Sequence, residues 1–344
     1  MKILIVRLSA LGDIVHALPV LAAINKAMPD AQVDWLVEEN YAPILSIVPG
    51  LHRRIIVRAK RSFATPEAIS FGGWRGYPAA ASYLRNQDYD VALDLQGLLK
   101  SSIWARSSFA NRVVGFDQPN LRERQAAFLY SETVTPLDAS HVIGKNLSIL
   151  AALEIEPGAI EVPLAPSASM ATTAAIEAAG GSRRFIVLNP GAAWPNKRWP
   201  ADRFGALAAS LRDRLGRSSL ITWGPSEREL AESVARASSG AASLAPATTV
   251  SDLAVLMREA ALVVSGDTGP LHIAAAIGTP LVGLYGPTWP ERNGPWDPQD
   301  VVISRASGCV CHHKRQCLRG APCINEITVE EVVQASERRL QARP

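Results

Sequence analysis

The chain has 344 residues and no apolar run of about 20 residues, the length that a helix needs to cross a bilayer. Its start also lacks a secretory signal. The apolar stretch after Lys2 is short, and Gly12-Asp13 stands where a cleavage site would be expected. We therefore expect a cytoplasmic protein, which could still sit on a membrane surface.

Cysteine is absent before position 309, and all four cysteines then fall within fifteen residues. Their pattern, C-x-C-x5-C-x5-C, is not a standard zinc-ribbon spacing. A cytoplasmic location argues against structural disulfides. Two interpretations stay open, a structural metal bound by three or four thiols and a set of free or redox-active thiols. The residues concerned are Cys309, Cys311, Cys317 and Cys323.

A large excess of charge of one sign is missing too. The formal net charge is +3, which implies no nucleic acid or other polyanion as a partner of the whole chain. The charge is uneven, because residues 51–66 contain five Lys or Arg and no acid. This stretch suits either a solvated face or an acidic partner of the first half.

What is present is a globular composition, with 48% hydrophobic and 19% charged residues, in a chain long enough for two domains. Short apolar runs alternate with helical segments. Strands are predicted at 3–8, 33–37, 54–57, 91–95, 112–115, 185–188, 219–223, 261–264 and 280–285. Helices are predicted at 14–28, 41–47, 78–85, 98–107, 141–153, 201–215, 227–237, 251–259 and 271–277. This order indicates an α/β fold with parallel sheets covered on both faces. The Pro-rich stretch 156–182 is expected to link the two halves.

The segment Leu262–Pro287 predicts one strand-turn-helix-strand unit. Its turn, Ser265–Pro270, is rich in small residues, and the following helix begins there. The free N–H groups and the positive dipole end of such a helix suit a phosphate. The simpler interpretation is an ordinary unit with Asp267 or Thr268 as the N-cap.

Two further loops follow predicted strands. In the first, Gly12 permits close backbone approach, and Asp13 is either a first-turn acid or a proton acceptor at the strand end. In the second, 189–199, Lys197 and Arg198 could neutralise a diphosphate or form a solvated basic loop.

Five motifs together carry a resemblance: RLSALGDIVHALP at 7–19, DLQGLLKS at 94–101, NPGAAWPNKRWP at 189–200, WGPSERE at 223–229 and SGDTGPLHIAAA at 265–276. In this order and spacing they resemble the bacterial lipopolysaccharide heptosyltransferases, glycosyltransferase family 9. VEENYA at 37–42 makes the chain most similar to the type I enzymes.

The resemblance implies a GT-B fold, with two Rossmann-like domains whose parallel sheets face each other across a cleft. Residues 1–165 would bind the acceptor and 166–325 the ADP-sugar, and a C-terminal helix in 326–344 would pack back on the first domain. The implied reaction is inverting transfer of L-glycero-D-manno-heptose from ADP-heptose to the Kdo of the lipid A inner core. It would take place at the inner-leaflet membrane surface, without nucleic acid and without a cofactor required for catalysis.

The matching positions imply the roles of individual residues. Asp13 matches the catalytic base. The donor would be bound by Lys197, Glu227, Asp267, Thr268, Gly269 and His272. The acceptor would be bound by Ser9, Gly12, Gln96, Lys100 and Arg122. The basic cluster 53–61 would face phosphorylated lipid A at an anionic membrane.

One departure is that Ala192 and Ala193 stand where hydroxyl residues are expected, so backbone N–H groups would have to replace their phosphate contacts. The open alternatives are type II transfer to an inner-core heptose, a sugar-nucleotide 2-epimerase on the same fold, and a non-catalytic nucleotide-sugar binding protein.

Overall fold

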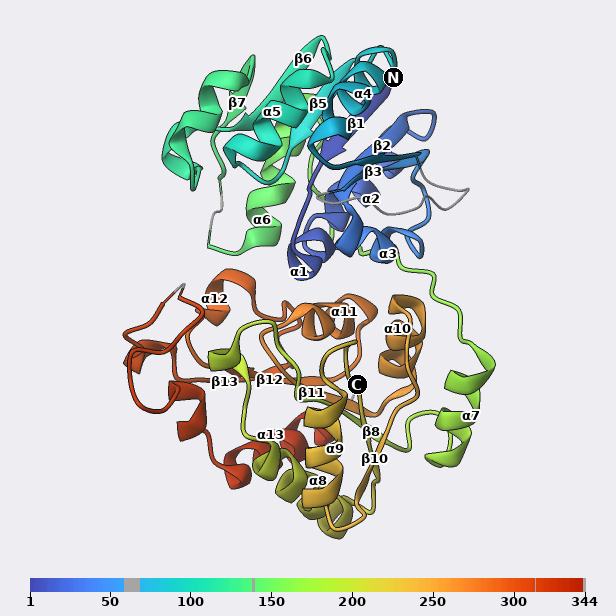
Figure 1. Cartoon of the computed structure of the whole chain (residues 1–344), viewed down its shortest axis with the longest axis vertical. Helices are drawn as coiled ribbons and strands as arrows, with labels where there is room; N and C mark the ends of the chain where they lie inside the picture. Colours follow the sequence, from blue (N-terminus) through green and yellow to red (C-terminus); the bar gives the residue numbers. More distant parts are fainter. Residues whose placement is uncertain (59–68, 138–139, 313, 343–344) are drawn as a thin grey trace. The chain divides into compact units, whose positions relative to one another are not determined.

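A computed structural model describes residues 1–58, 69–137, 140–312 and 314–342. The chain divides into two compact units, Met1–Ala165 and Pro166–Pro344 (Figure 1). The division follows Ala165, within the Pro-rich stretch 156–182. No helix among the described residues is long and apolar enough to span a membrane.

The first unit is built on a seven-stranded parallel sheet in the order β4-β3-β2-β1-β5-β6-β7. Its strands are β1 (Lys2–Val6), β2 (Gln32–Glu38), β3 (Arg53–Arg58), β4 (Ile69–Gly72), β5 (Val91–Asp94), β6 (Arg112–Phe116) and β7 (Glu132–Val134). The central strand β1 is apolar and buried from Ile3 to Val6, as a strand covered on both faces must be. The two edge strands, β4 and β7, were not predicted, because they are short and lack a clear apolar run.

Helices cover both faces of this sheet. They are α1 (Leu11–Val15), α2 (Leu18–Ala27), α3 (Ala42–Leu45), α4 (Gly73–Arg85), α5 (Leu99–Ser107) and α6 (Val142–Leu147). Helices α4 and α5 pack together on one face, and α2 packs with α6. The helix predicted at 14–28 is two helices, because Pro19 has no N–H to bond the preceding turn and instead fits the first turn of α2. The helix predicted at 141–153 continues from α6 as a 3₁₀ helix, Ser148–Leu153.

The second unit repeats the plan with a six-stranded parallel sheet in the order β10-β9-β8-β11-β12-β13. Its strands are β8 (Ile186–Asn189), β9 (Ser219–Ile221), β10 (Ala242–Leu244), β11 (Leu262–Gly266), β12 (Leu281–Tyr285) and β13 (Val301–Ser304). Its helices are α7 (Met170–Ala178), α8 (Ala201–Leu215), α9 (Arg228–Ala237), α10 (Val250–Glu259), α11 (Gly269–Ile277), α12 (Pro290–Asn293) and α13 (Val329–Gln341).

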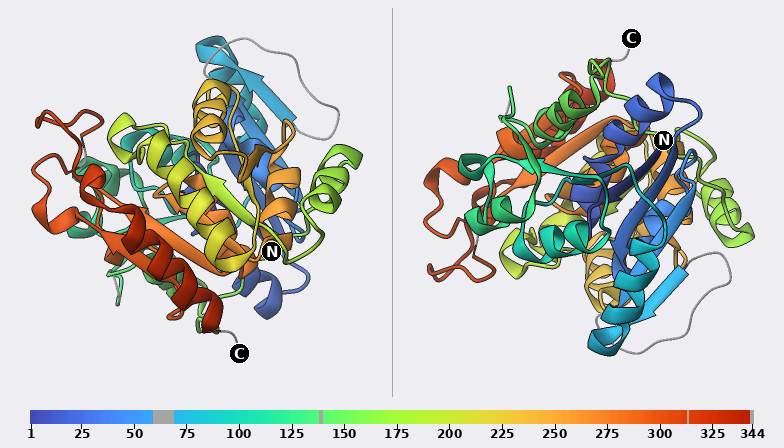
Figure 2. Two further views of the ribbon diagram at one scale, coloured as in Figure 1. Left: turned by 90° about the horizontal axis from the view of Figure 1, so that it is seen from below. Right: turned by 90° about the horizontal axis from the view of Figure 1, so that it is seen from above.

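The C-terminal helix α13 belongs to the core of the second unit. It lies beside α8 and over β12 and β13, as Figure 2 shows. Its buried Val332, Val333 and Ala335 join the same apolar cluster as Phe204 and Leu207 of α8. The prediction that this helix packs back on the first domain is therefore wrong. Its apolar stripe covers the end of the second sheet, which α8 and α9 leave open.

A buried ion pair fixes α13 to this sheet. Arg339 donates from Nε to Asp300 Oδ1 at 2.8 Å, and both side chains are almost fully buried. The same oxygen accepts the Leu281 N–H at 3.1 Å. Burial raises the pKa of Asp300 to about 6, although Arg339 opposes this shift.

Replacing Arg339 with Met should leave the Asp300 carboxylate buried without its cation and cost about 3 kcal/mol of unfolding free energy at pH 8. The folded-state pKa of Asp300 lies above its unfolded value near ~4, so stability falls as pH rises through the folded pKa. At pH 5 the carboxyl takes up a proton, and the loss should shrink. Urea unfolding of wild type and Arg339→Met at pH 8 and at pH 5 measures this loss of unfolding free energy.

The neighbouring Arg338 provides the control, because it is exposed on the same helix. Arg338→Met should change the unfolding free energy by less than ~0.5 kcal/mol. An equal loss for both variants, or an Arg339→Met loss that does not depend on pH, would contradict this account of the pair.

Candidate active site

The loop after β1 holds Asp13 in a defined orientation. Asp13 lies in the first turn of α1, where its Oδ2 accepts the Ala10 N–H at 3.3 Å. Its Oδ1 lies 3.1 Å from Nη2 of Arg7. The Asp13 side chain is 36% exposed, whereas that of Arg7 is only 8% exposed. Asp13 is thus a partly exposed carboxylate held by a buried cation.

Arg7 is itself anchored in the sheet. Its Nη1 donates to the Leu95 carbonyl at the end of β5. Its own carbonyl accepts the indole N–H of Trp35 at 3.2 Å. These contacts fix the guanidinium before it reaches Asp13. The sequence reasoning missed this role, because a single arginine after a strand has no distinguishing pattern.

Three residues predicted on the acceptor side, Ser9, Gly12 and Gln96, lie in the same loop cluster. Gln96 Oε1 accepts the Leu8 N–H at 2.8 Å, and Gln96 Nε2 lies 3.5 Å from Ser9 Oγ. Gly12 is buried in α1 beside Asp13. Because β1 and β5 are parallel neighbours, their carboxyl ends bring these loops together.

Asp94, at the end of β5, links several residues at this edge of the sheet through hydrogen bonds. One of its oxygens accepts the Gln96 N–H at 2.8 Å, and the other accepts the hydroxyls of Ser101 and Tyr130, each at 2.8 Å. Asp94 is fully buried, and this burial raises its pKa. Its role is to fix the turn that carries Gln96.

The remaining predicted acceptor residues lie further out. Lys100, in the first turn of α5, pairs with Glu38. Arg122 is exposed, just before the 3₁₀ helix η3 (Arg124–Leu129). In the basic cluster 53–61, Arg53 donates to Gln87 Oε1 at 2.6 Å, whereas residues 59–61 lie outside the described residues.

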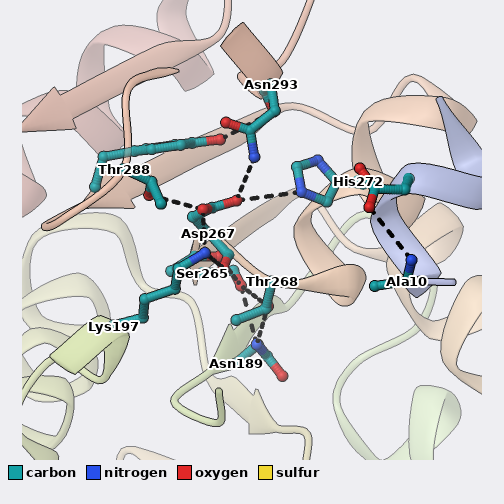
Figure 3. A network of polar contacts seen from close by, with 12 residues as sticks. Ala10, Asn189, Lys197, Ser265, Asp267, Thr268, His272, Thr288 and Asn293 are labelled. Carbon is teal, nitrogen blue, oxygen red and sulfur yellow. Dashed lines mark hydrogen bonds and ion pairs between the residues drawn. The ribbon is translucent and has the colours of Figure 1, made fainter. Parts of the chain in front are cut away.

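In the second unit, the polar network is centred on Asp267, which follows β11 (Figure 3). Oδ2 accepts from Lys197 Nζ at 2.5 Å and from Thr288 Oγ1 at 2.7 Å. Oδ1 accepts from Asn293 Nδ2 at 2.9 Å and lies 3.3 Å from His272 Nε2. The carboxylate is 4% exposed, so these contacts replace water.

Burial of Asp267 would by itself raise its pKa. The contact with His272 and the charge of Lys197 outweigh burial and keep the pKa well below its usual range. Asp267 is therefore an ionised structural anchor. His272 and Lys197, both predicted on the donor side, are placed by it.

Lys197 is positioned at the mouth of helix α11. Its ammonium lies 4.9 Å from the centre of the Trp194 ring, and its side chain is 16% exposed. The ammonium donates to Oδ2 of Asp267 and lies 3.4 Å from the Asp267 carbonyl, which leaves one of its three N–H donors for a further anion.

The N-terminus of α11 is open. Thr268 is its N-cap residue and makes no side-chain cap hydrogen bond to the helix; Thr268 and Gly269 are partly accessible. Asn189 Nδ2, at the end of β8, donates to Ser265 Oγ at 2.9 Å and to Thr268 Oγ1 at 3.2 Å. The first turn of an α-helix has N–H groups without helical partners, and these favour an anion.

Glu227 lies at the N-cap of α9 and closes the other side of this edge. Its Oε2 accepts the Gly224 N–H at 3.1 Å, and its Oε1 lies 3.7 Å from Arg198 Nη2. A Cβ at Gly191 would lie 2.0 Å from Oε2, so any side chain at this position would displace the carboxylate. Ala192, where a hydroxyl was expected, is buried, and its carbonyl accepts from Arg198 Nε at 2.8 Å.

Two partners of Asp267 escaped the sequence reasoning, Thr288 after β12 and Asn293 at the end of α12. They lie 21 and 26 positions beyond Asp267. No local signal identifies them, because they reach Asp267 only after β12 has paired with β11.

The four cysteines gather in one cluster, and none is in a disulfide. Cys311 Sγ lies 3.5 Å from Cys317 Sγ and accepts the Leu318 N–H, which lowers the pKa of Cys311. Burial raises the pKa of Cys323 to about 12. In the described part of the chain, no three His, Cys, Asp or Glu side chains are arranged to hold a metal ion. A structural metal here stays a prediction.

Comparison with known proteins places this architecture. The family profile Glycosyltransferase family 9 (heptosyltransferase) matches residues 79–321. Lipopolysaccharide heptosyltransferase 1 of Pseudomonas aeruginosa is 31% identical over 92% of this chain and 87% of its own length. Lipopolysaccharide heptosyltransferase 3 of Escherichia coli is 27% identical over 80% of this chain and 81% of its own.

Among solved structures, the E. coli heptosyltransferase WaaC with ADP has a TM-score of 0.78 at 24% identity and covers 98% of this chain and 100% of its own. The fold is therefore the GT-B fold, built from two Rossmann-like domains. The profile covers well over half of the sequence, and the P. aeruginosa relative extends the match across most of the rest. The chain thus belongs to glycosyltransferase family 9, the heptosyltransferases, and is a glycosyltransferase.

Proposed function

We propose that this protein is an inverting transferase that moves L-glycero-D-manno-heptose from ADP-heptose to the Kdo of the lipid A inner core. The observation that carries the proposal is the carboxylate of Asp13, which is partly exposed and is held by the buried guanidinium of Arg7. The similarity of the chain to lipopolysaccharide heptosyltransferase 1 also supports the proposal.

In this mechanism the acceptor hydroxyl attacks the anomeric carbon of the heptose. The new C–O bond forms as the bond from that carbon to the diphosphate oxygen breaks, and the configuration inverts. ADP leaves with the electron pair, and the hydroxyl proton passes to Asp13. A positioned general base typically accelerates a reaction by a factor of about 10²–10⁴.

The second domain stabilises the leaving group. The diphosphate would accept hydrogen bonds from the backbone N–H groups of Thr268 and Gly269 at the start of α11. It would also accept one from the ammonium of Lys197. Asp267 and His272 hold this lysine and this helix in place, and Glu227 would bind the ribose or base. Catalysis in this scheme requires no cofactor.

The acceptor side belongs to the first domain. Ser9, Gly12 and Gln96 line the loops beside Asp13, and Lys100 and Arg122 supply positive charge toward the acidic Kdo. A lipid-borne acceptor places the reaction at the cytoplasmic face of the inner membrane, where the protein would be peripheral.

The acceptor is the point that relatives alone do not decide, because one of them is a heptosyltransferase 3. The alternative within the family is type II transfer to an inner-core heptose. Membership of a transferase family argues against the 2-epimerase and against a binding protein without activity. Assaying ADP-heptose with Kdo₂-lipid A and, separately, with a heptosylated acceptor distinguishes the two transferases, and following epimerisation of the sugar nucleotide separates the epimerase from the binding protein.

Replacing Asp13 with Asn should lower kcat for heptose transfer about 10²–10⁴-fold, because the amide cannot take the proton. The affinity for ADP should stay unchanged, since the nucleotide is bound by the other domain. Single-turnover assays and calorimetric titration with ADP measure the two effects. Transfer by Asp13→Asn at the wild-type rate would show that the base is another group.

Replacing Lys197 with Met should weaken ADP binding about 10- to 100-fold, the value of a charge-assisted hydrogen bond. Asp267→Asn should weaken it too, and the double variant should lose less than the sum, because the lysine acts through its anchor. Arg184→Met, at an exposed position of the same unit, is the control. If the losses of ADP affinity in the two single variants add up in the double variant, Asp267 does not act through Lys197.

Gly191→Ala should displace the Glu227 carboxylate, because its Cβ would lie 2.0 Å from Oε2. We expect the KM for ADP-heptose to rise about tenfold, the effect of one lost hydrogen bond to a charged group. Gly308→Ala is the control, because nothing lies within 4 Å of the added Cβ. Equal KM values for the two variants would contradict a role of Glu227 in binding the donor.

A further inference from the structure

Four large apolar side chains are exposed in one part of the first unit. Leu99 and Ile103 lie on α5, Phe109 follows α5, and Phe128 lies on η3, which contacts α5. Ile103 is 43%, Phe109 56% and Phe128 80% exposed. Single exposed apolar residues need no explanation, but a group on adjoining elements does.

Helix α5 has an unusual distribution of side chains. Its buried side includes Ser101 and Ser102, which donate to Asp94 and to a backbone carbonyl. Its exposed side includes Leu99 and Ile103, one turn apart. The same buried side contributes Trp104 and Ala105 to the apolar core, so Leu99 and Ile103 lie on the opposite, exposed side of the helix.

Cations accompany these apolar groups. Arg106 follows on the same face of α5, and Arg124 is exposed on η3. The guanidinium groups of Arg85 and Arg106 lie 3.9 and 5.8 Å from the centre of the Phe109 ring. The acid Glu123 is half-buried, and one of its carboxylate oxygens accepts the Leu99 N–H at 2.7 Å.

We name this the α5–η3 surface and define it as Leu99, Ile103, Arg106, Phe109, Arg124 and Phe128. Apolar side chains surrounded by arginines suit the interface of an anionic bilayer, where rings enter the acyl boundary and cations meet the headgroups. We propose that the α5–η3 surface docks the enzyme on an anionic phospholipid membrane.

The position of the surface fits this role. Helix α5 begins directly after the Gln96–Gly97 turn, on the carboxyl edge of the sheet that carries Asp13. In Figure 1, α5 lies over one face of the first sheet, the face that it shares with α4. This inference rests on the proposed function, because a lipid-borne acceptor has to be reached at a bilayer.

Vesicle binding tests the docking without the reaction. The probe is vesicles of phosphatidylglycerol and phosphatidylethanolamine without acceptor, compared with pure phosphatidylcholine. Phe128→Ser and Ile103→Ser should each weaken binding about tenfold by removing inserted apolar area. Arg106→Gln and Arg124→Gln should each weaken it about fivefold on anionic vesicles only. Rising salt should erase the arginine effects.

Met170→Ser and Arg184→Gln are the matched controls, because both positions are exposed in the second unit. Thermal unfolding confirms that each variant is folded. Equal vesicle binding by wild type, α5–η3 variants and controls overturns the proposal. A wild-type dimer in sedimentation velocity that Phe128→Ser dissociates also overturns it, in favour of a second copy of the chain.

Transfer assays separate this inference from the proposed function. The α5–η3 variants should lose transfer to Kdo₂-lipid A in vesicles and keep wild-type transfer to its deacylated, water-soluble form. If wild type transfers to neither acceptor, the proposed function fails. If wild type transfers to both and the variants match it on vesicles, only the docking surface fails.

Discussion

The second domain depends on the burial of one charge, the carboxylate of Asp267. Removing a carboxylate from water costs several kcal/mol unless it is compensated by partners of good geometry. Its partners come from the loop after β8, from α11 and from the segment after β12. Satisfying Asp267 therefore fixes three loops at the carboxyl edge of the sheet at once. The open N-terminus of α11 and the ammonium of Lys197 take their positions from this requirement.

The first domain has a buried carboxyl at the equivalent edge, and the contrast is instructive. Among the described residues, Asp94 receives hydrogen bonds from backbone and hydroxyl groups and from no cation, and burial raises its pKa. At this edge the cation, Arg7, pairs with the half-exposed Asp13 instead. In the second domain the cation pairs with the buried acid, and in the first with the accessible one. Of these paired acids, Asp13 in the first domain is therefore the accessible one, and Asp267 in the second is shielded from water.

The sequence sufficed for the parallel α/β architecture and for the loops that carry polar residues, because apolar runs mark the strands and a strand ends where its loop begins. It also predicted that Lys197, Asp267 and His272 act together, through the family motifs. It did not predict Thr288 and Asn293, because their contacts exist only after distant strands pair. The helix α13 was assigned to the wrong domain, since an amphipathic pattern shows which face is buried and not which sheet covers it.

The geometry around Asp13 suits the role of general base that we propose for it, because buried Arg7 contacts only one of its two oxygens. Arg7 spends one nitrogen on the Leu95 carbonyl and another on Asp13 Oδ1, so its orientation is set by the sheet rather than by the acid. The second oxygen, Oδ2, has only the long 3.3 Å contact with Ala10. One oxygen is thus fixed and the other is nearly unengaged. In the proposed reaction this asymmetry would favour proton transfer to Oδ2, because the fixed Oδ1 sets the direction in which Oδ2 meets the acceptor hydroxyl.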